Sequence, residues 1–499
     1  MKKWIEKFKK REKKMPKVWQ SLVVLSILIA SLAVGILVFG SDAHVPLLVG
    51  VAAAAIMALF IGYRWHEIEQ FMINGIAKSL QSAVILVLIG VLVGVWIAAG
   101  IVPTMIYYGL AVLKPQIFFL ATLLICSISS LATGSSWGTM GTMGVALLGI
   151  AQGLGLNIGI TAGAIISGAY FGDKLSPLSD TTNLAPSMAG TDVITHIKHM
   201  LPSTLIVYGA CAIFFTVIGF VKYHGGNTDL SQVELYMTTL KGSFNISPWL
   251  FLVPVAVIVA IALKLPAIPG IALGVLMGAI FGLIFQNNCS LGDIFNCGMN
   301  GYIADTGVEA INDLLTNGGI MNMTYAITLI VISMAFGGIM EETHLLGVIV
   351  DKLKKLAKTP GGLVTMTEVT CIASNCVVPD QYISIIIPGR MYAEEYKEKD
   401  LSPSSLSNAL ESAGTVTSAL VPWNTCGAYI KTNLGVTVVQ YGPWAVFNWL
   451  MPVITVIMAY FGLNLKDRNG VPLYKKKRED KKRNKEIEVT SEETETVSE

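Results

Sequence analysis

Long apolar runs separated by short polar segments fill most of this chain. Several of these runs reach the roughly 20 residues that a helix needs to cross the hydrocarbon core of a bilayer. Others are short and interrupted by Gly or Pro. This pattern predicts an all-α polytopic membrane protein that contains broken helices. The runs lie near residues 18–40, 46–63, 81–102, 117–132, 139–153, 159–172, 201–221, 247–263, 267–286, 323–340, 363–373, 381–388, 406–421 and 443–463.

The second half of the chain repeats short features of the first half in the same order. Four such matches in one order are much less expected by chance than two or three, and they predict two structural repeats, 18–222 and 247–465. The offset between matching positions drifts from about 220 to 245, and an insertion near 303–321 explains most of the drift. The matches are Pro46 to Gly50 with Pro266 to Gly270, Gly94 with Gly337, Ala132 to Ser136 with Ala373 to Val377, and Ser167 to Pro177 with Ser412 to Pro422.

Composition and the placement of charge support a membrane protein and orient it. Hydrophobic residues make up 53% of the chain and charged residues 14%, whereas a soluble domain carries about 25% charge. Nine Lys and Arg crowd the segment 1–17, and the tail 466–499 begins nearly as basic. By the positive-inside rule both termini are expected in the cytoplasm of a cell-membrane protein, and the cation-poor linker 223–246 outside. The two repeats would then have inverted topologies. A basic tail that binds nucleic acid is the less favoured alternative.

The stretch from Gly168 to Asn183 is the first candidate for chemistry. Asp173 and Asp180 lie seven residues apart, which is two helical turns, but Pro177 interrupts the helix between them. Such a break frees backbone carbonyls, and carbonyls, carboxylates and hydroxyls together suit a hard cation such as Na⁺. The alternative is a capped turn at the membrane edge whose acids face water. The neighbouring oxygen donors are Ser176, Ser179, Thr181, Thr182 and Asn183.

A second polar stretch begins at Glu411, inside an otherwise neutral helix. An ionisable residue within a membrane segment is a functional hypothesis by default. Small residues at every third position from 132 to 144 predict close packing of helices, and their hydroxyls are expected to face the ion path unless packing is their whole role. The matching positions of the second repeat follow residue 373. These candidates are Thr415, Thr417, Asn424 and Thr425, then Thr133, Ser135, Ser136 and Thr139, and finally Ser374, Asn375 and Asp380.

A few charged residues lie outside these stretches. Glu341 ends an apolar run and is either a cation site or an interfacial acid. Lys174, Arg390 and Lys431 are candidates for binding an organic anion, although Arg390 is as well explained by snorkelling to the interface. No catalytic triad, Walker motif or metal-binding cluster of Cys and His occurs in the sequence. We therefore expect neither an enzyme nor an ATP-driven pump, and no cofactor beyond the transported ions.

The long motif at 168–183 resembles the NhaC family of sodium/proton antiporters. The stretches 379–382, 388–391 and 414–429 resemble the same family, and the resemblance runs from about residue 18 to 465. It implies two inverted-topology repeats with re-entrant hairpins, a scaffold joined to a transport domain, and often a homodimer. Relatives often carry an acid next to the glutamate of the second motif. Here Ser412 stands at that position, so Glu411 is the carboxylate that remains.

These observations lead to one functional hypothesis with two alternatives. We expect a secondary active transporter that extrudes Na⁺ in exchange for protons by alternating access, with Asp173, Asp180 and Glu411 as the exchangeable acids. The resemblance also implies a second reading, a Na⁺- and H⁺-coupled exchanger of organic anions of the malate and lactate type. A membrane receptor or scaffold without transport is disfavoured by the duplicated broken helices.

Overall fold

The computed structural model describes residues 13–223, 230–263, 265–287, 289–354, 356–378, 380–468 and 470–473. Most of the predicted basic N-terminal segment and of the charged tail lie outside these residues, as does part of the predicted linker. The described chain is helical, and the extended pairings within it are three isolated bridges. The all-α architecture predicted from the hydrophobic pattern is therefore confirmed.

The helices follow one another closely along the chain. In the first half they are α2 (Val18–Ala33), η1 (Val34–Val38), α3 (His44–Ile61), α4 (Trp65–Ala77), α5 (Leu80–Ala98), α6 (Ile101–Val112), α7 (Pro115–Thr133), α8 (Ser136–Thr139), η2 (Met140–Gly144), α9 (Val145–Gly153), α10 (Ile158–Leu175), α11 (Asp180–Ala189) and α12 (Val193–Lys222). In the second half they are α13 (Leu230–Ser243), η3 (Pro248–Phe251), α14 (Leu252–Ala262), α15 (Ala267–Phe285), α16 (Leu291–Asn300), α17 (Glu309–Leu315), α18 (Ile320–Glu342), α19 (Leu345–Lys354), α20 (Pro360–Val377), α21 (Ile383–Glu398), α22 (Pro403–Leu410), η4 (Glu411–Thr415), η5 (Val416–Leu420), α23 (Thr425–Leu434), α24 (Val438–Tyr441), η6 (Gly442–Trp444) and α25 (Val446–Tyr460).

Seven helices in the described part of the chain are long and apolar enough to cross a membrane, or up to nine if each bent pair counts as one span. One bent pair joins residues 233–243 to 248–260 at 91°, so much of the predicted linker 223–246 is a helix, α13. Its mixed polar sequence gave no sign of this structure. The two-repeat division, its inverted topology and the location of the termini stay predictions.

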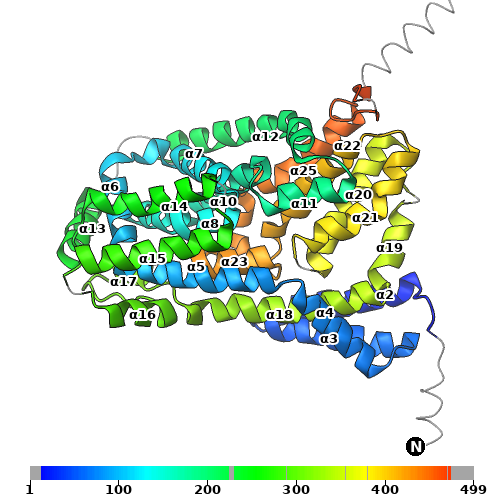
Figure 1. Ribbon diagram of the computed structural model, residues 1–499, viewed down its shortest axis with the longest axis horizontal. Coiled ribbons are helices and arrows are strands. Elements are labelled where there is room, and N and C mark those ends of the chain that lie inside the picture. The colour runs from blue at the N-terminus through cyan, green and yellow to red at the C-terminus, as the bar shows by residue number, and fades with distance from the viewer. Residues whose placement is uncertain are drawn as a thin grey trace, which may run out of the picture.

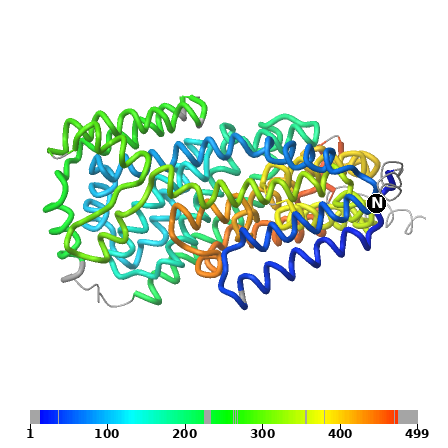
Figure 2. The backbone as a smooth tube through the Cα atoms, turned by 90° about the horizontal axis from the view of Figure 1, so that it is seen from below, coloured from blue at the N-terminus to red at the C-terminus, as the bar shows by residue number. Residues whose placement is uncertain are grey.

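The molecule is elongated, and its helices are grouped around a few central elements (Figure 1). Helices α5, α14, α15 and α18 run side by side, and α18 also packs on α3 and α4. Helices α20, α21 and α22 form a second group at the other end. Figure 2 shows the first helices, α2 and α3, paired along one edge.

Helix α10 is the most deeply enclosed element near the candidate site. Every residue from Ile160 to Leu175 is buried, against α7, α12 and α25. Glycines allow the close approach to α7: a Cβ added at Gly172 would lie 2.6 Å from the carbonyl oxygen of Ser127. Small residues serve this purpose between helices in membranes. The tight contact fixes the end of α10, where Asp173 stands.

Both predicted helix breaks are present. Helix α10 ends at Leu175, and α11 begins at Asp180 after a short turn that contains Pro177. The hydroxyl of Ser179 caps α11 by accepting a hydrogen bond from the backbone N–H of Thr182. In the second half, α22 passes into a π-helical turn at Glu411 and then a 3₁₀ turn, and α23 starts only at residue 425. Irregular backbone of this kind needs protein or water around it in a bilayer.

Candidate functional site

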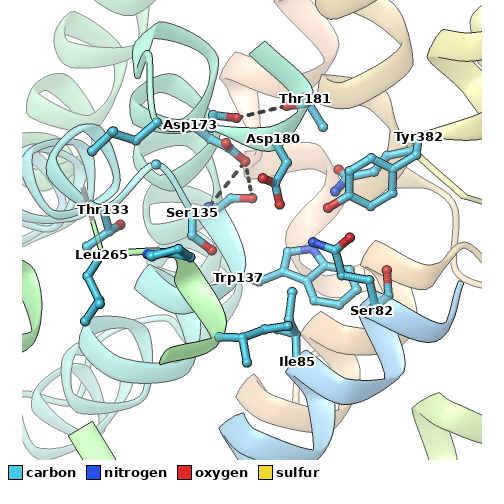
Figure 3. A pocket seen from close by; sticks show the side chains of 18 of the residues that line it. Ser82, Ile85, Thr133, Ser135, Trp137, Asp173, Asp180, Thr181, Leu265 and Tyr382 are labelled. Carbon is cyan, nitrogen blue, oxygen red and sulfur yellow. Dashed lines mark hydrogen bonds between the residues drawn. The ribbon is translucent and has the colours of Figure 1, made fainter. Parts of the chain in front are cut away.

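A cavity of about 540 Å³ opens beside the first helix break. Asp173 and Asp180 both point into it, and Trp137 and Tyr382 stand on its other side (Figure 3). Asp180 is exposed in the cavity, whereas the side chain of Asp173 is buried at its wall. Among the described residues that line the cavity, those two acids are the charged ones, and neither Lys nor Arg is present. The cavity is therefore an acidic chamber with hydroxyls around it.

Asp173 is held by the short helix α8. Its Oδ2 atom accepts a hydrogen bond of 2.6 Å from the hydroxyl of Ser136 and one of 3.3 Å from the backbone N–H of the same residue. The hydroxyl of Thr182 donates to the backbone carbonyls of Asp173 and Lys174, at 2.9 and 3.1 Å. These two hydrogen bonds connect the start of α11 to the end of α10. Ser135 and Thr133 line the same cavity.

Glu411 lies behind this wall, at the start of the π-helical turn. Its Oε1 atom accepts a hydrogen bond of 3.1 Å from Thr181, whose side chain also lines the cavity. The side chain of Glu411 is fully buried, and in the described part of the chain its Oε2 atom has no hydrogen-bond partner. The two broken helices, 230 residues apart in sequence, therefore meet at one hydroxyl–carboxylate contact.

The predicted residues of the second half form an amide network next to Glu411. The side-chain amide of Asn375 donates to the carbonyl of Gly414 at 2.8 Å and to the hydroxyl of Thr417 at 3.1 Å. Asn424 donates to the Asn375 side-chain oxygen at 3.1 Å and caps α23 at Cys426. These bonds satisfy the carbonyls that the irregular turn leaves open. The network shapes the second break.

Several other predicted residues have local roles at the edges of this region. Asp380 accepts hydrogen bonds from the backbone N–H groups of Tyr382 and Ile383, so one of its oxygens caps α21. Asn183 donates to carbonyls of its own turn. Five further predicted residues, all buried, surround the two breaks: Thr139, Ser176, Ser374, Thr415 and Thr425.

Glu341 and the three cations predicted to bind an organic anion do not line the cavity. Glu341 forms an ion pair of 2.6 Å with Lys78 at the end of α18, which matches the interfacial alternative. Arg390 is exposed on α21. Lys431 lines a different cavity and pairs with Asp42 at 2.6 Å. The fourth, Lys174, is fully buried and donates to the hydroxyl of Ser412 rather than lining the cavity. The three cations that were predicted to bind an organic anion therefore do not lie together in one site.

Glu368, a buried acid in the middle of α20, was not among the predicted site residues. Its side chain is 2% exposed. The residue lies in the predicted apolar run 363–373, and its charge inside that run was the signal that could have identified it.

The arrangement suits a small hard cation better than a transition metal. Carboxylate, hydroxyl and carbonyl oxygens are the donors that such cations prefer. In the described part of the chain, no three His, Cys, Asp or Glu side chains are grouped as a metal site. All seven cysteines are free, Cys289 and Cys297 included.

Comparison with known proteins gives a consistent result. Residues 168–463 match the family described as the Na⁺/H⁺ antiporter family. The chain is 37% identical over 452 residues to a malate-2H⁺/Na⁺-lactate antiporter of Bacillus subtilis, covering 91% of this chain and 96% of that protein. It is 34% identical over 445 residues to the Na⁺/H⁺ antiporter NhaC of Alkalihalophilus pseudofirmus, covering 89% and 96%. It is 36% identical over 464 residues to the arginine/ornithine antiporter ArcD of Halobacterium salinarum, covering 92% and 95%.

Proposed function

This chain belongs to the Na⁺/H⁺ antiporter family and is a multi-pass secondary antiporter rather than an enzyme, and we propose that it extrudes Na⁺ in exchange for protons by alternating access. The observation that carries the proposal is the acidic cavity at the first helix break. Two carboxylates and several hydroxyls line it, and no cationic side chain among the described lining residues would repel a sodium ion.

The buried acids explain why Na⁺ and protons compete. An ionised carboxylate buried away from water is costly unless a positive charge or hydrogen bonds compensate it. The Oδ2 atom of Asp173 accepts hydrogen bonds from the hydroxyl and the backbone N–H of Ser136, and the Oε1 atom of Glu411 accepts one from Thr181, while its Oε2 atom has no partner among the described residues. Each acid is therefore stabilised either by a proton or by a nearby cation. Because both use the same oxygens, binding one disfavours the other.

The same cost supports coupled exchange rather than a leak. Movement between the two access states with empty, ionised carboxylates would carry uncompensated charge through a region of low dielectric. The states loaded with Na⁺ or with protons avoid this cost. In our proposal only loaded states change access, so that each sodium ion leaves against protons that enter.

Exchange of organic anions is the alternative, since one relative is a malate and lactate antiporter. The cations that were candidates for binding a carboxylate are dispersed: Lys174 is buried against Ser412, Arg390 is exposed on α21, and Lys431 is paired with Asp42. This dispersal favours a cation over an anion as the occupant of the cavity.

The test is exchange in proteoliposomes that contain the purified protein and an internal pH indicator. An inward Na⁺ gradient should drive proton efflux without any organic solute. Parallel vesicles receive malate and lactate, or arginine and ornithine, on opposite sides. If proton movement requires one of these solutes, the proposal is overturned in favour of exchange of that solute.

A further inference from the structure

Glu368 is a buried acid for which the proposed exchange cycle has so far no role. In the described part of the chain, neither of its carboxylate oxygens has a hydrogen-bond partner. Leaving one charge of a buried ion pair uncompensated is strongly destabilising, so an acid placed here in the middle of a helix needs a partner in at least one state of the protein. Its counter-charge is the ammonium group of Lys174, with which it interacts electrostatically.

Among the described residues, Lys174 has two acidic neighbours and forms an ion pair with neither. Its ammonium group interacts electrostatically with both Glu411 and Glu368. Among the described residues it forms no ion pair within 4.0 Å with either carboxylate. Its ammonium group donates a hydrogen bond to the hydroxyl of Ser412 at 3.0 Å, and an ammonium group has three donors in all. The lysine therefore interacts with two acids and has N–H donors beyond the one that Ser412 accepts.

The two acids are not equivalent. Glu411 touches the cavity wall through Thr181 and has one open oxygen. Glu368 belongs to α20, which packs against the turn that carries Glu411 but does not line the cavity. Among the described residues, Tyr396 of α21 and Cys371 of α20 also interact electrostatically with Glu368. One buried ammonium group can compensate one of the two carboxylates at a time.

We propose that Glu368 is the alternate partner of Lys174, which pairs with Glu411 when that acid holds no cation and with Glu368 when a cation binds beside Glu411. This rests on the proposed function, since it needs a cation at Glu411. The ammonium group and the bound cation carry like charges, which repel strongly in a region of low dielectric constant. Transfer of the ammonium group to Glu368 removes that repulsion. Glu368 is then a positioning residue that sets the affinity for the cation.

The test measures Na⁺-dependent exchange as KM and maximal rate in proteoliposomes. Glu368→Gln leaves Lys174 only Glu411 as a partner, so we expect KM for Na⁺ to rise at least tenfold, with a smaller change in maximal rate. Glu368→Asp keeps the charge and should stay closer to the unchanged protein. In Lys174→Gln/Glu368→Gln no ammonium group competes, so KM should fall below that of the single Glu368→Gln variant.

Controls separate this role from a structural one. Glu394→Gln makes the same chemical change at an exposed acid of α21 and should leave KM unchanged. Binding of Na⁺ is also followed as a rise in the unfolding temperature of the detergent-solubilised variants. An unchanged KM in Glu368→Gln overturns the ion-pair exchange while leaving Na⁺/H⁺ antiport intact, and so does the absence of rescue by the second substitution. If the unchanged protein neither binds nor exchanges Na⁺, the proposed function fails, and the ion-pair exchange fails with it.

Discussion

Replacing Asp173 with Asn should abolish cation exchange while leaving the fold intact. The two side chains have the same shape, and the amide oxygen of Asn can still accept the hydrogen bonds from Ser136. What is lost is the negative charge at the cavity wall. A unit charge 4 Å from a bound cation contributes about 4 kcal/mol at an effective dielectric constant of 20, and tenfold in affinity corresponds to about 1.4 kcal/mol. The affinity for Na⁺ should therefore fall by about 1,000-fold.

The assay is Na⁺-driven proton flux in proteoliposomes, at Na⁺ concentrations below the KM of the unchanged protein. We expect the flux of Asp173→Asn to fall at least about 100-fold, with an unfolding temperature within a few degrees of the unchanged protein. Asp192→Asn is the matched control, because Asp192 is an exposed N-cap of α12 and Asn caps helices equally well. Full Na⁺-dependent proton flux in Asp173→Asn would refute the assignment of Asp173 to the cation site.

Two further substitutions test the scaffold. Gly172→Ala would place a Cβ 2.5–2.6 Å from atoms of α7, so α10 must shift, and we expect a loss of about 1–3 kcal/mol of stability and a reduced flux. Gly209→Ala is the control, because a Cβ there has nothing within 4 Å, and it should change neither stability nor flux. Unfolding temperatures of the two variants measure the difference in stability. In the loop before α3, a hydrogen bond from the Lys431 ammonium group lowers the pKa of Asp42. The stability it provides is full above the unfolded value of about 3.9 and is lost as pH falls through the folded value, so Asp42→Asn should be less stable at pH 7, and the difference should shrink as pH falls below about 3.9. An unfolding-temperature difference that stays constant over this range would contradict the pairing.

Hydrophobic runs predicted the helices well because burial in lipid demands both apolar side chains and satisfied backbone groups. The run at 81–102 corresponds to α5, which ends just before Gly100, a residue with positive φ. The same signal failed for α13, because that helix has a mixed sequence and its presence depends on tertiary contacts with α6 and α9. Polarity alone could not separate a polar helix from a linker.

Many residues of the site could be predicted from the sequence, but the contacts between them could not. Proline and hydroxyl residues inside apolar runs identified both helix breaks, and the acids Asp173 and Asp180 do share one cavity. No spacing rule indicates that Thr181 contacts Glu411, or that Lys174 turns away from the cavity toward Ser412. These choices depend on which face of each broken helix packs against the other half of the chain. For Glu341 the sequence left a cation site and an interfacial acid open, and the ion pair with Lys78 matches the second of these.

The hydrogen bond between Thr181 and Glu411 connects the cavity to the buried charges behind its wall. Thr181 touches the cavity on one side and Glu411 on the other, and Glu411 shares the ammonium group of Lys174 with Glu368. A cation that reaches the Thr181 hydroxyl therefore acts on charges that never face the cavity. The side chain of Glu368 is buried, so its charge needs compensation, and in our proposal Lys174 or a proton supplies it. In our proposal one bound ion changes the partners of these buried charges, and this makes the binding of Na⁺ and the binding of protons mutually exclusive.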